Sequence, residues 1–233
     1  FMYLLTETAS PFALERWAAF FANFGQFAKG FFYTLGISIG ALIVALLLGL
    51  IFGAMSSTHN KVLRGISRVY VEIFQNTPLL VQFVVVFYGI SILTDGHVMI
   101  PISLTAILCV GVYTGAYISE IIRTGIEAVP KGQTEAALSQ GFTYADTMRI
   151  IILPQAVRTI LPPLTNQVVN LIKNTSTVAI ISGADIMFTA KAWAYDTTNY
   201  VPAFAGAAFL YFIMCFPLAT WARRKEEENK KAY

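Results

Sequence analysis

The chain has 233 residues, of which 56% are hydrophobic and only 12% are charged, and its formal net charge is +3. Soluble domains typically carry about 25% charged residues, so this composition excludes a soluble globular domain and indicates an all-α integral membrane protein. Its basic residues are spread along the chain, which argues against a nucleic-acid-binding patch.

Residues 1–24 are predicted to form an extracytoplasmic segment that lies at the membrane interface. Glu7 and Glu15 interrupt it, and no basic start precedes an apolar core, so it does not resemble a signal peptide. Its aromatic residues suit the depth of the lipid headgroups, although a merely covered extension is the alternative. The residues expected on its apolar face are Pro11, Phe12, Leu14, Trp17, Phe20 and Phe21.

Uncharged stretches predict five membrane-spanning helices within a transmembrane domain over residues 25–222. A helix needs about 20 apolar residues to cross a hydrocarbon core about 30 Å thick. Four stretches reach that length without an internal charge, and a fifth contains only Lys173. The predicted spans cover about residues 30–57, 73–94, 98–120, 159–184 and 199–222.

The first predicted span carries four glycines in two pairs of four-residue spacing. Gly36 and Gly40 form one pair, and Gly49 and Gly53 form the other. Small residues at this spacing let membrane helices approach closely, so the span is expected to pack tightly on its own subunit or on a twin.

The distribution of lysine and arginine predicts the orientation. If the N-terminus is outside, three basic residues follow the first span on the cytoplasmic side, four lie between the third and fourth spans and five lie in the tail. These are twelve of the 16 basic residues. The sequence therefore predicts an outside N-terminus, an inside C-terminus and a cytoplasmic tail over residues 223–233.

Residues 130–154, between the third and fourth spans, predict a cytoplasmic helical hairpin. Pro130 ends the preceding helix, and Gly141 suits the left-handed position that closes a short helix over residues 134–140. A second short helix over residues 144–152 is expected to stop at Pro154. The alternative is a surface loop that only links two spans.

The predicted span over residues 159–184 is the most polar one. Asn166, Asn170, Lys173 and Asn174 lie along one helical stripe, which is expected to face the interior, either to line a path or to pack against helices. A charge in mid-membrane costs at least about 2.5–3.5 kcal/mol, so Lys173 must face protein, water or a counter-ion.

Lys173 has two interpretations. It could attract the carboxylate of a substrate, or it could pair with Glu72 or Glu120 at the inner ends of the second and third spans, or with backbone carbonyls. Gln82 could complete a pocket with three tyrosines, for which core packing is the alternative. These tyrosines are Tyr88, Tyr113 and Tyr117.

Catalytic and metal-binding motifs are absent from the sequence. It contains no Gly-x-x-x-x-Gly-Lys-Ser/Thr phosphate cradle and no Gly-x-Gly-x-x-Gly motif. His59 and His97 fall on opposite sides of the predicted membrane, and Cys109 and Cys215 lie in apolar runs as packing residues. We therefore expect a chain that is not an enzyme and that binds no metal or cofactor itself.

The hairpin carries a specific resemblance. Glu135-Ala136-Ala137, a glycine at Gly141 and the later Ile151-x-Leu153-Pro154 resemble the EAA loop in membrane subunits of ATP-binding-cassette (ABC) importers. Further blocks at residues 70–82, 115–123, 129–133, 153–166 and 171–176 resemble permeases of the polar amino acid uptake family, of the glutamine, histidine and arginine type. The resemblance runs from about residue 25 to 225.

This resemblance implies a type I ABC importer permease fold with cytoplasmic coupling helices, in the cell membrane of a bacterium. Such permeases work in pairs, either two copies or a copy with a paralogue, and carry two ATPase subunits that bind ATP and Mg. An extracytoplasmic binding protein delivers the amino acid. The implied ATPase-coupling residues are Glu135, Ala136, Ala137, Gly141, Ile151, Leu153 and Pro154, and our substrate-pathway candidates are Glu72, Gln82, Glu120, Asn166, Asn170 and Lys173.

The chain departs from the family pattern before Thr77-Pro78, where many relatives have Arg-Gly and this chain has Gln75-Asn76. A guanidinium is thereby replaced by neutral amides, so no role of that arginine can be transferred. The carried amino acid stays open, since Glu72 and Glu120 would favour cations whereas Lys173 would favour anionic or neutral substrates.

The alternative function is that of an ion- or proton-coupled secondary carrier or a channel, with Lys173 and Glu120 as relay groups. The hairpin argues against it, and so does the lack of a duplicated half with broken helices. A membrane enzyme would need a nucleophile beside a base, and the sequence offers no such pair.

Overall fold

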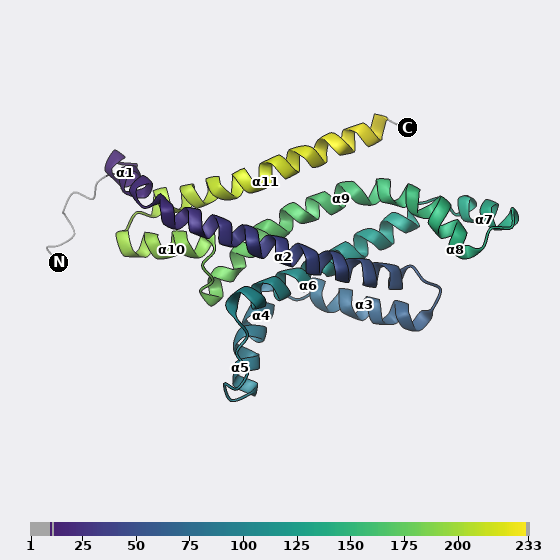
Figure 1. Ribbon diagram of the computed structural model, residues 1–233, viewed down its shortest axis with the longest axis horizontal. Coiled ribbons are helices and arrows are strands. Elements are labelled where there is room, and N and C mark those ends of the chain that lie inside the picture. The colour runs from purple at the N-terminus through teal and green to yellow at the C-terminus, as the bar shows by residue number, and fades with distance from the viewer. Residues whose placement is uncertain (1–9, 11, 232–233) are drawn as a thin grey trace.

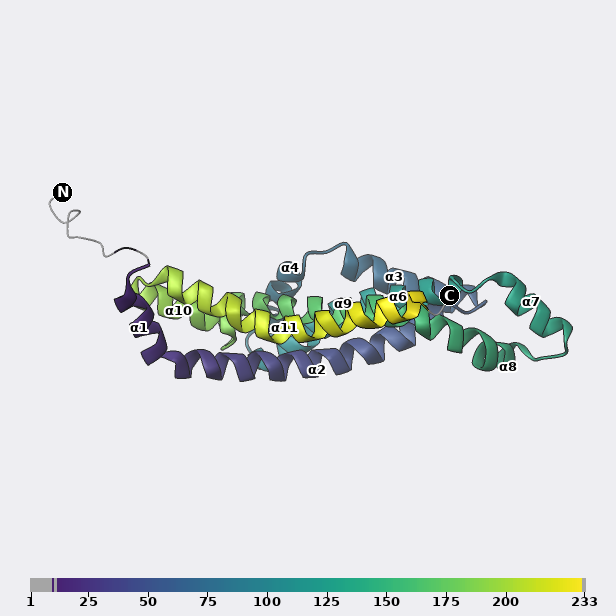
Figure 2. The same cartoon turned by 90° about the horizontal axis from the view of Figure 1, so that it is seen from above.

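A computed structural model describes residues 10 and 12–231, which form helices and turns with no β-strand among them. The long helices run along the longest axis of the molecule, and a helical hairpin extends beyond one end of this bundle (Figure 1). The view from above shows the same extension (Figure 2). The predicted all-helical class is confirmed for the described residues.

The elements follow one another along the chain as α-helices interrupted by two π-helical turns and one 3-10 turn. They are α1 (Leu14–Ala22), α2 (Phe24–Ser56), α3 (Lys61–Gln75), α4 (Leu79–Val84), the π-helix η1 (Val85–Gly89), α5 (Ile90–Leu93), α6 (Ile102–Glu127), α7 (Lys131–Ser139), α8 (Tyr144–Asp146), the π-helix η2 (Thr147–Ile152), α9 (Leu153–Asn174), the 3-10 helix η3 (Thr175–Ile181), α10 (Ile186–Thr197) and α11 (Tyr200–Lys231).

Three helices of the described chain are long and apolar enough to cross a membrane: α2, α6 and the part of α11 from Tyr200 to Lys225. The bent pair formed by α3 and Leu79–Leu93 would be a fourth. Polar side chains interrupt α9, although its 22 residues would extend about 33 Å. The count of five spans therefore stays a prediction.

The second predicted span, residues 73–94, is not one straight helix. The chain bends by 97° between α3 and α4, at the break formed by residues 76–78. Pro78 has no backbone donor and disfavours helical geometry at the residue before it, so an apolar run with a proline in it does not continue as a helix.

The fourth predicted span, residues 159–184, also differs. Helix α9 begins earlier, at Leu153, and ends at Asn174, and the 3-10 turn that follows stops at Ser182 with a φ of 59°. Helix α10 then starts behind Asp185, whose carboxylate accepts hydrogen bonds from the backbone N–H groups of Met187 (3.0 Å) and Phe188 (3.2 Å). An aspartate before an apolar run is a signal for the start of a helix, and hydropathy alone does not contain this signal.

The described part of the N-terminal segment is the short helix α1, which packs on α10 and α11. Phe20 is buried against Phe27 and Trp193, with ring centroids 4.8 and 6.0 Å away. The Arg16 guanidinium donates to the carbonyl of Thr198 and to Asn199 Oδ1, both at 2.9 Å. The predictions for Glu7 and Pro11 lie outside the described residues.

Helices α2 and α6 form the most extensive helix contact in the described chain. Gly40, Gly49 and Gly53 face isoleucines of α6 so closely that a Cβ atom at any of them would overlap the isoleucine side chain. The predicted close packing of the first span is therefore confirmed at these three positions, on the chain's own α6. Gly36 is different, because a Cβ there would meet nothing within 4 Å.

Helix α6 contributes its own small residues to this contact. A Cβ at Gly111 would meet Val44, and one at Gly115 would meet the phenolic oxygen of Tyr70 and the side chain of Leu48. The two helices thus alternate glycines with branched side chains, which brings their backbones close together.

We predict that Gly49→Ala lowers the thermal unfolding midpoint of the detergent-solubilised protein, because the new Cβ would overlap Ile118. Overpacking of this kind costs about 1–3 kcal/mol. The matched control is Gly36→Ala on the same helix, where the methyl group meets open space and helix propensity improves by about 1 kcal/mol. Equal midpoints for the two variants would contradict the close contact.

Candidate functional site

The helical hairpin at one end of the bundle consists of α7, α8 and η2 (Figure 1). Helix α6 ends at Glu127, and Pro130 precedes α7 in an extended conformation with a ψ of 132°. Gly141 has a φ of +87°, so the predicted left-handed glycine is confirmed. Its N–H donates to the carbonyl of Leu138 (3.0 Å), and this bond closes α7.

The second arm of the hairpin does not stop at Pro154, which corrects our expectation. The Thr143 hydroxyl caps α8 by accepting a hydrogen bond from the N–H of Asp146 (3.2 Å), and the chain then stays helical from Tyr144 to Asn174. The π-helical η2 lies directly before the proline, where the missing N–H would break a regular α-helical ladder. The second arm of the hairpin and α9 are therefore one continuous helical body.

The two alanines of the hairpin face opposite ways. Ala137 is only 3% exposed and packs inside the hairpin, as does Ile152, which the sequence did not single out. Glu135 and Ala136 are exposed, and so are Leu153 and Pro154. Of the two alanines among the implied coupling residues, only Ala136 is therefore open to contact with another chain.

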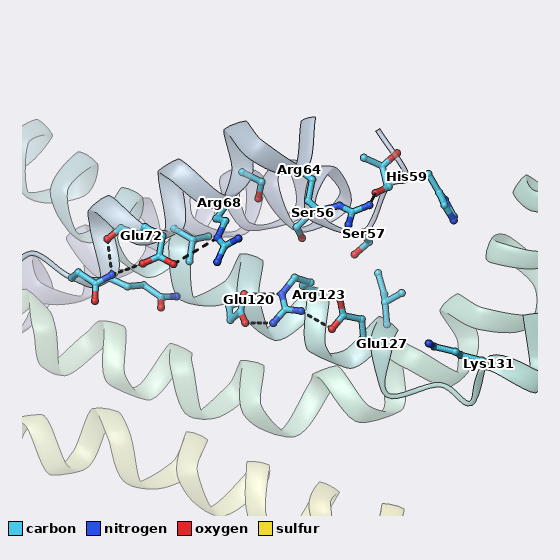
Figure 3. Close-up of a pocket in the computed structure, with 16 residues that line it drawn as sticks. Ser56, Ser57, His59, Arg64, Arg68, Glu72, Glu120, Arg123, Glu127 and Lys131 are labelled. Atoms are coloured by element: carbon cyan, nitrogen blue, oxygen red, sulfur yellow. Dashed lines mark hydrogen bonds and ion pairs between the residues drawn. The ribbon is translucent and has the colours of Figure 1, made fainter. Parts of the chain in front are cut away.

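A charged slot lies between α3 and α6 near the hairpin (Figure 3). It is a cavity of about 930 Å³ that reaches from the α2–α3 turn to Gln75 and Asn76. A second cavity of about 650 Å³ lies between the same turn and the hairpin. His59 and Lys131 line both cavities, and the His59 ring packs edge-on against Tyr144 of the hairpin, with centroids 5.2 Å apart.

The slot brings Glu72 and Glu120 together, two of the residues predicted for the substrate pathway. Each carboxylate is paired within its own helix: Glu72 lies 3.9 Å from the Arg68 guanidinium on α3, and Glu120 pairs with Arg123 on α6. Arg123 also pairs with Glu127 one turn further along. None of the ion pairs found among residues 10 and 12–231 crosses the slot, so each wall carries its own counter-ions.

Gln82 lies at the bend. Its Nε2 donates to the carbonyl oxygens of Phe74 and Thr77, each at 3.2 Å, and to Thr77 Oγ1 at 2.8 Å. These bonds satisfy carbonyl groups at the C-terminal end of α3, which have no backbone donor within the helix, and they connect α3 to α4. The structure thus gives Gln82 a positioning role at the bend, apart from the slot that contains Glu72 and Glu120.

The neutral pair before the bend also terminates α3. Gln75 Nε2 donates to the carbonyl of Ala116 (3.2 Å), and Asn76 Nδ2 donates to the carbonyl (2.8 Å) and the carboxylate (2.9 Å) of Glu72. Amides can make these bonds to carbonyls, so the departure at Gln75-Asn76 has a structural use in this chain.

We expected the polar stripe of α9 to face the interior of the chain, and the structure shows that it does not. Asn166, Asn170 and Lys173 are exposed, whereas Gln167, which the stripe omits, is buried. The interpretation in which Lys173 pairs with Glu72 or Glu120 is not supported, because the ion pairs of those carboxylates are with Arg68 and Arg123. The stripe instead offers amides and a cation to whatever covers this side of the chain.

The hydrogen bonds found for Gln82 in the described part of the chain do not involve the tyrosines considered for a pocket. Tyr113 and Tyr117 share a hydrogen bond between their hydroxyl groups (3.1 Å) on α6. Tyr88 is 46% exposed on η1.

Comparison with known proteins gives consistent matches. Residues 45–226 match the family described as "Binding-protein-dependent transport system inner membrane component". The chain is 37% identical over 216 residues to the probable glutamine ABC transporter permease protein GlnM of Bacillus subtilis (strain 168), covering 91% of this chain and 97% of that protein. It is 33% identical over 208 residues to the glutamate/aspartate import permease protein GltJ of Escherichia coli (strain K12), covering 82% of this chain and 85% of that protein.

The fold is similar to that of a solved protein. A crystal structure of an amino acid ABC transporter with histidines superposes with a TM-score of 0.84 at 31% identity, covering 91% of this chain and 98% of that one.

We predict that Gln82→Leu lowers the free energy of unfolding by about 1–3 kcal/mol, because the carbonyls of Phe74 and Thr77 lose their side-chain donor. The thermal midpoint in detergent would report this loss. Gln26→Leu is the matched control, since Gln26 is exposed and makes one long bond of 3.4 Å to Asn23. A Gln82 variant as stable as this control would refute the role at the bend.

Proposed function

Because the chain belongs to the family of binding-protein-dependent transport system inner membrane components, we propose that it is the permease subunit of an ATP-driven importer of polar or charged L-amino acids. Its fold is the type I ABC permease fold. The relatives are named for glutamine and for glutamate or aspartate, which supports a polar amino acid as substrate. The proposed location is the inner membrane of a bacterium.

The observation that carries this proposal is the hairpin. It extends beyond the bundle, its first arm exposes Glu135 and Ala136, and its second arm continues without a break into α9 (Figure 1). A separate ATPase subunit that grips α7 would therefore move α9 as a rigid lever. ATP and Mg would be bound by two such subunits, and this chain would bind neither.

The proposed orientation places the hairpin in the cytoplasm and the N-terminal segment outside. In support, the hairpin end of the bundle also carries the charged slot, and the basic residues gather at that end. Five crossings would then be α2, the bent pair of α3 and α4–α5, α6, α9 with η3, and α11. An extracytoplasmic binding protein would deliver the amino acid at the opposite end, near α1 and α10.

The proposed substrate path combines the slot with the polar face of α9. The slot offers water, carboxylates and guanidinium groups near the hairpin, and Asn166, Asn170 and Lys173 offer amides and a cation further along. These groups suit a zwitterion that carries both a carboxylate and an ammonium group. A second permease chain would cover the exposed stripe and close the path.

We predict that Ala136→Trp reduces ATP hydrolysis stimulated by substrate and binding protein at least about tenfold, because the indole would block the approach of the ATPase to α7. A tenfold loss corresponds to about 1.4 kcal/mol of docking free energy. ATP hydrolysis is measured in proteoliposomes. ATP is either enclosed or added outside, and only ATP on the side of the membrane that carries the hairpin should drive transport.

The control for this variant is Gly65→Trp, at an exposed position of α3 where an added Cβ atom would meet nothing within 4 Å. It should leave stimulation unchanged. The importer proposal fails if Ala136→Trp stimulates normally, or if amino acid uptake continues with no ATPase present.

We also predict that Asn170→Leu raises the KM for amino acid uptake about fivefold while the complex still assembles, because one hydrogen-bonding group of the path is lost, worth about 1 kcal/mol. Thr165→Val, on another face of α9, is the control. An unchanged KM in both variants would remove the α9 stripe from the path.

A further inference from the structure

The second cavity, which we call the hairpin cavity, lies between the hairpin and the α2–α3 turn and has a volume of about 650 Å³. Small-molecule sites commonly have volumes of about 300–1,000 Å³. Residues of four segments line it: the α2–α3 turn, the end of α6, α7 and the second arm of the hairpin. A molecule bound in this cavity would therefore touch the hairpin and the bundle at the same time.

One wall of the hairpin cavity carries a buried hydroxyl group without a partner. Thr147 lines the cavity from η2 and is only 1% exposed. Its Oγ1 makes no hydrogen bond to any of the described residues. Buried hydroxyl groups in native proteins nearly always have a partner, so a molecule in the cavity is expected to supply one.

The cavity also carries a cation at the start of α7. Lys131 belongs to none of the ion pairs found among residues 10 and 12–231, and Figure 3 shows its ammonium group pointing toward Glu127. Helix α7 begins there with no capping side chain and with no acidic residue in its first turn. The positive end of the helix dipole therefore adds to the charge of Lys131 and favours a carboxylate beside it.

An anion faces the same space. Glu127 lines the hairpin cavity at the end of α6 and pairs with Arg123 through Oε2. Its second oxygen, Oε1, takes part in no hydrogen bond or ion pair found within the described chain. This oxygen is available to accept a hydrogen bond from an ammonium group.

Apolar side chains cover much of the remaining wall: Ile126, Val129, Met148 and Ile152. A cation, an anion and an apolar surface together suit a zwitterion with an aliphatic body, which is the chemistry of a free amino acid. A phosphate group fits less well, because the carboxylates of Glu127 and Glu135 on the wall would repel it.

We propose that the hairpin cavity binds a free amino acid from the cytosol, with its carboxylate on Lys131 and the Thr147 hydroxyl and its ammonium group on Glu127. The inference rests on the proposed function, since the imported product is the ligand. A ligand stabilises the arrangement that it binds, so it opposes a displacement of the hairpin from the α2–α3 turn and from α6. The product that accumulates in the cytosol thus slows further uptake, through a site in the permease itself.

The test uses the assembled transporter in proteoliposomes, with the loaded binding protein on one side and ATP on the hairpin side. L-Glutamine is the probe, because the proposed polar contacts involve only groups common to all amino acids. Added on the hairpin side, it should inhibit ATP hydrolysis. N-Acetyl-L-glutamine lacks the ammonium group and L-glutaminamide lacks the carboxylate, so each should inhibit at least about tenfold more weakly. Equal inhibition by the three compounds would overturn the proposed recognition.

Two variants locate the site. Lys131→Met should raise the half-inhibiting concentration of L-glutamine at least about tenfold, and Thr147→Val about fivefold, because they remove a charged and a neutral hydrogen-bonding group. Thr147→Val keeps the shape of the side chain and removes a hydroxyl group without a partner in the described chain, so its thermal midpoint should match that of wild type. Glu135 is left unchanged because it is also an implied coupling residue.

The matched controls lie outside both cavities. Thr114→Val removes another buried hydroxyl group that has no partner among the described residues, and Lys61→Met removes an exposed lysine at the start of α3. Both variants should be inhibited like wild type. Inhibition that is equally strong in Lys131→Met and Thr147→Val would overturn the site, because L-glutamine would then act elsewhere in the complex.

Hydrogen–deuterium exchange gives a readout that does not depend on ATP hydrolysis. In the nucleotide-free transporter without binding protein, L-glutamine should slow the exchange of amides within residues 131–152 in wild type and in Thr114→Val, but not in Thr147→Val. An unprotected hairpin in a transporter that imports amino acids would overturn the site and leave the importer proposal intact. Protection of the hairpin in a complex that ATP does not drive would instead defeat the importer proposal alone.

Discussion

The close contact between α2 and α6 is the constraint on which the other elements depend. Glycines on both helices bring the backbones together, and isoleucines fill the space between them. Helix α3 then attaches to this pair through polar groups aimed at backbone carbonyls. Ser67 Oγ donates to Phe52 and Tyr70 Oη to Val112, both at 2.7 Å. The Tyr70 ring also stacks on that of Phe52, with centroids 4.1 Å apart, and the slot lies beside the helix that these contacts hold in place.

The continuity of the hairpin with α9 gives the bundle one long body that reaches from outside the helices to the polar stripe. The α2–α3 turn touches this body through the ring contact of His59 with Tyr144. A displacement of the hairpin would therefore move two parts of the chain at once. It would shift α9 as far as Lys173, and through the α2–α3 turn it would shift α3 and the bend at Pro78. The proposed transport cycle needs such a link between its two ends.

Local signals in the sequence predicted the features that local chemistry determines. Gly141 was identified from its place after a helix-forming run, and the glycines of α2 from their spacing. The bend was missed because Pro78 sits in an apolar run of spanning length, and because the bonds of Gln82 to Phe74 and Thr77 form only once the chain has turned. The end of α9 was missed for a similar reason, since hydropathy continues through η3. The direction of the α9 stripe could not be predicted from one sequence, because a polar face exposed on a single chain has the same periodicity as an interior polar face.

The paired charges on the walls of the slot have a mechanical consequence. Since Arg68 pairs with Glu72 on one helix, and Arg123 pairs with Glu120 and Glu127 on the other, the slot can widen or narrow without breaking any of these pairs. None of the ion pairs found in the described chain would have to break as the width of the slot changes, in contrast to a gap closed by ion pairs that span it. A swing of α3 would instead have to break the hydrogen bonds of Ser67, Tyr70 and Gln75 to neighbouring carbonyls, together with the stacking of Tyr70 on Phe52.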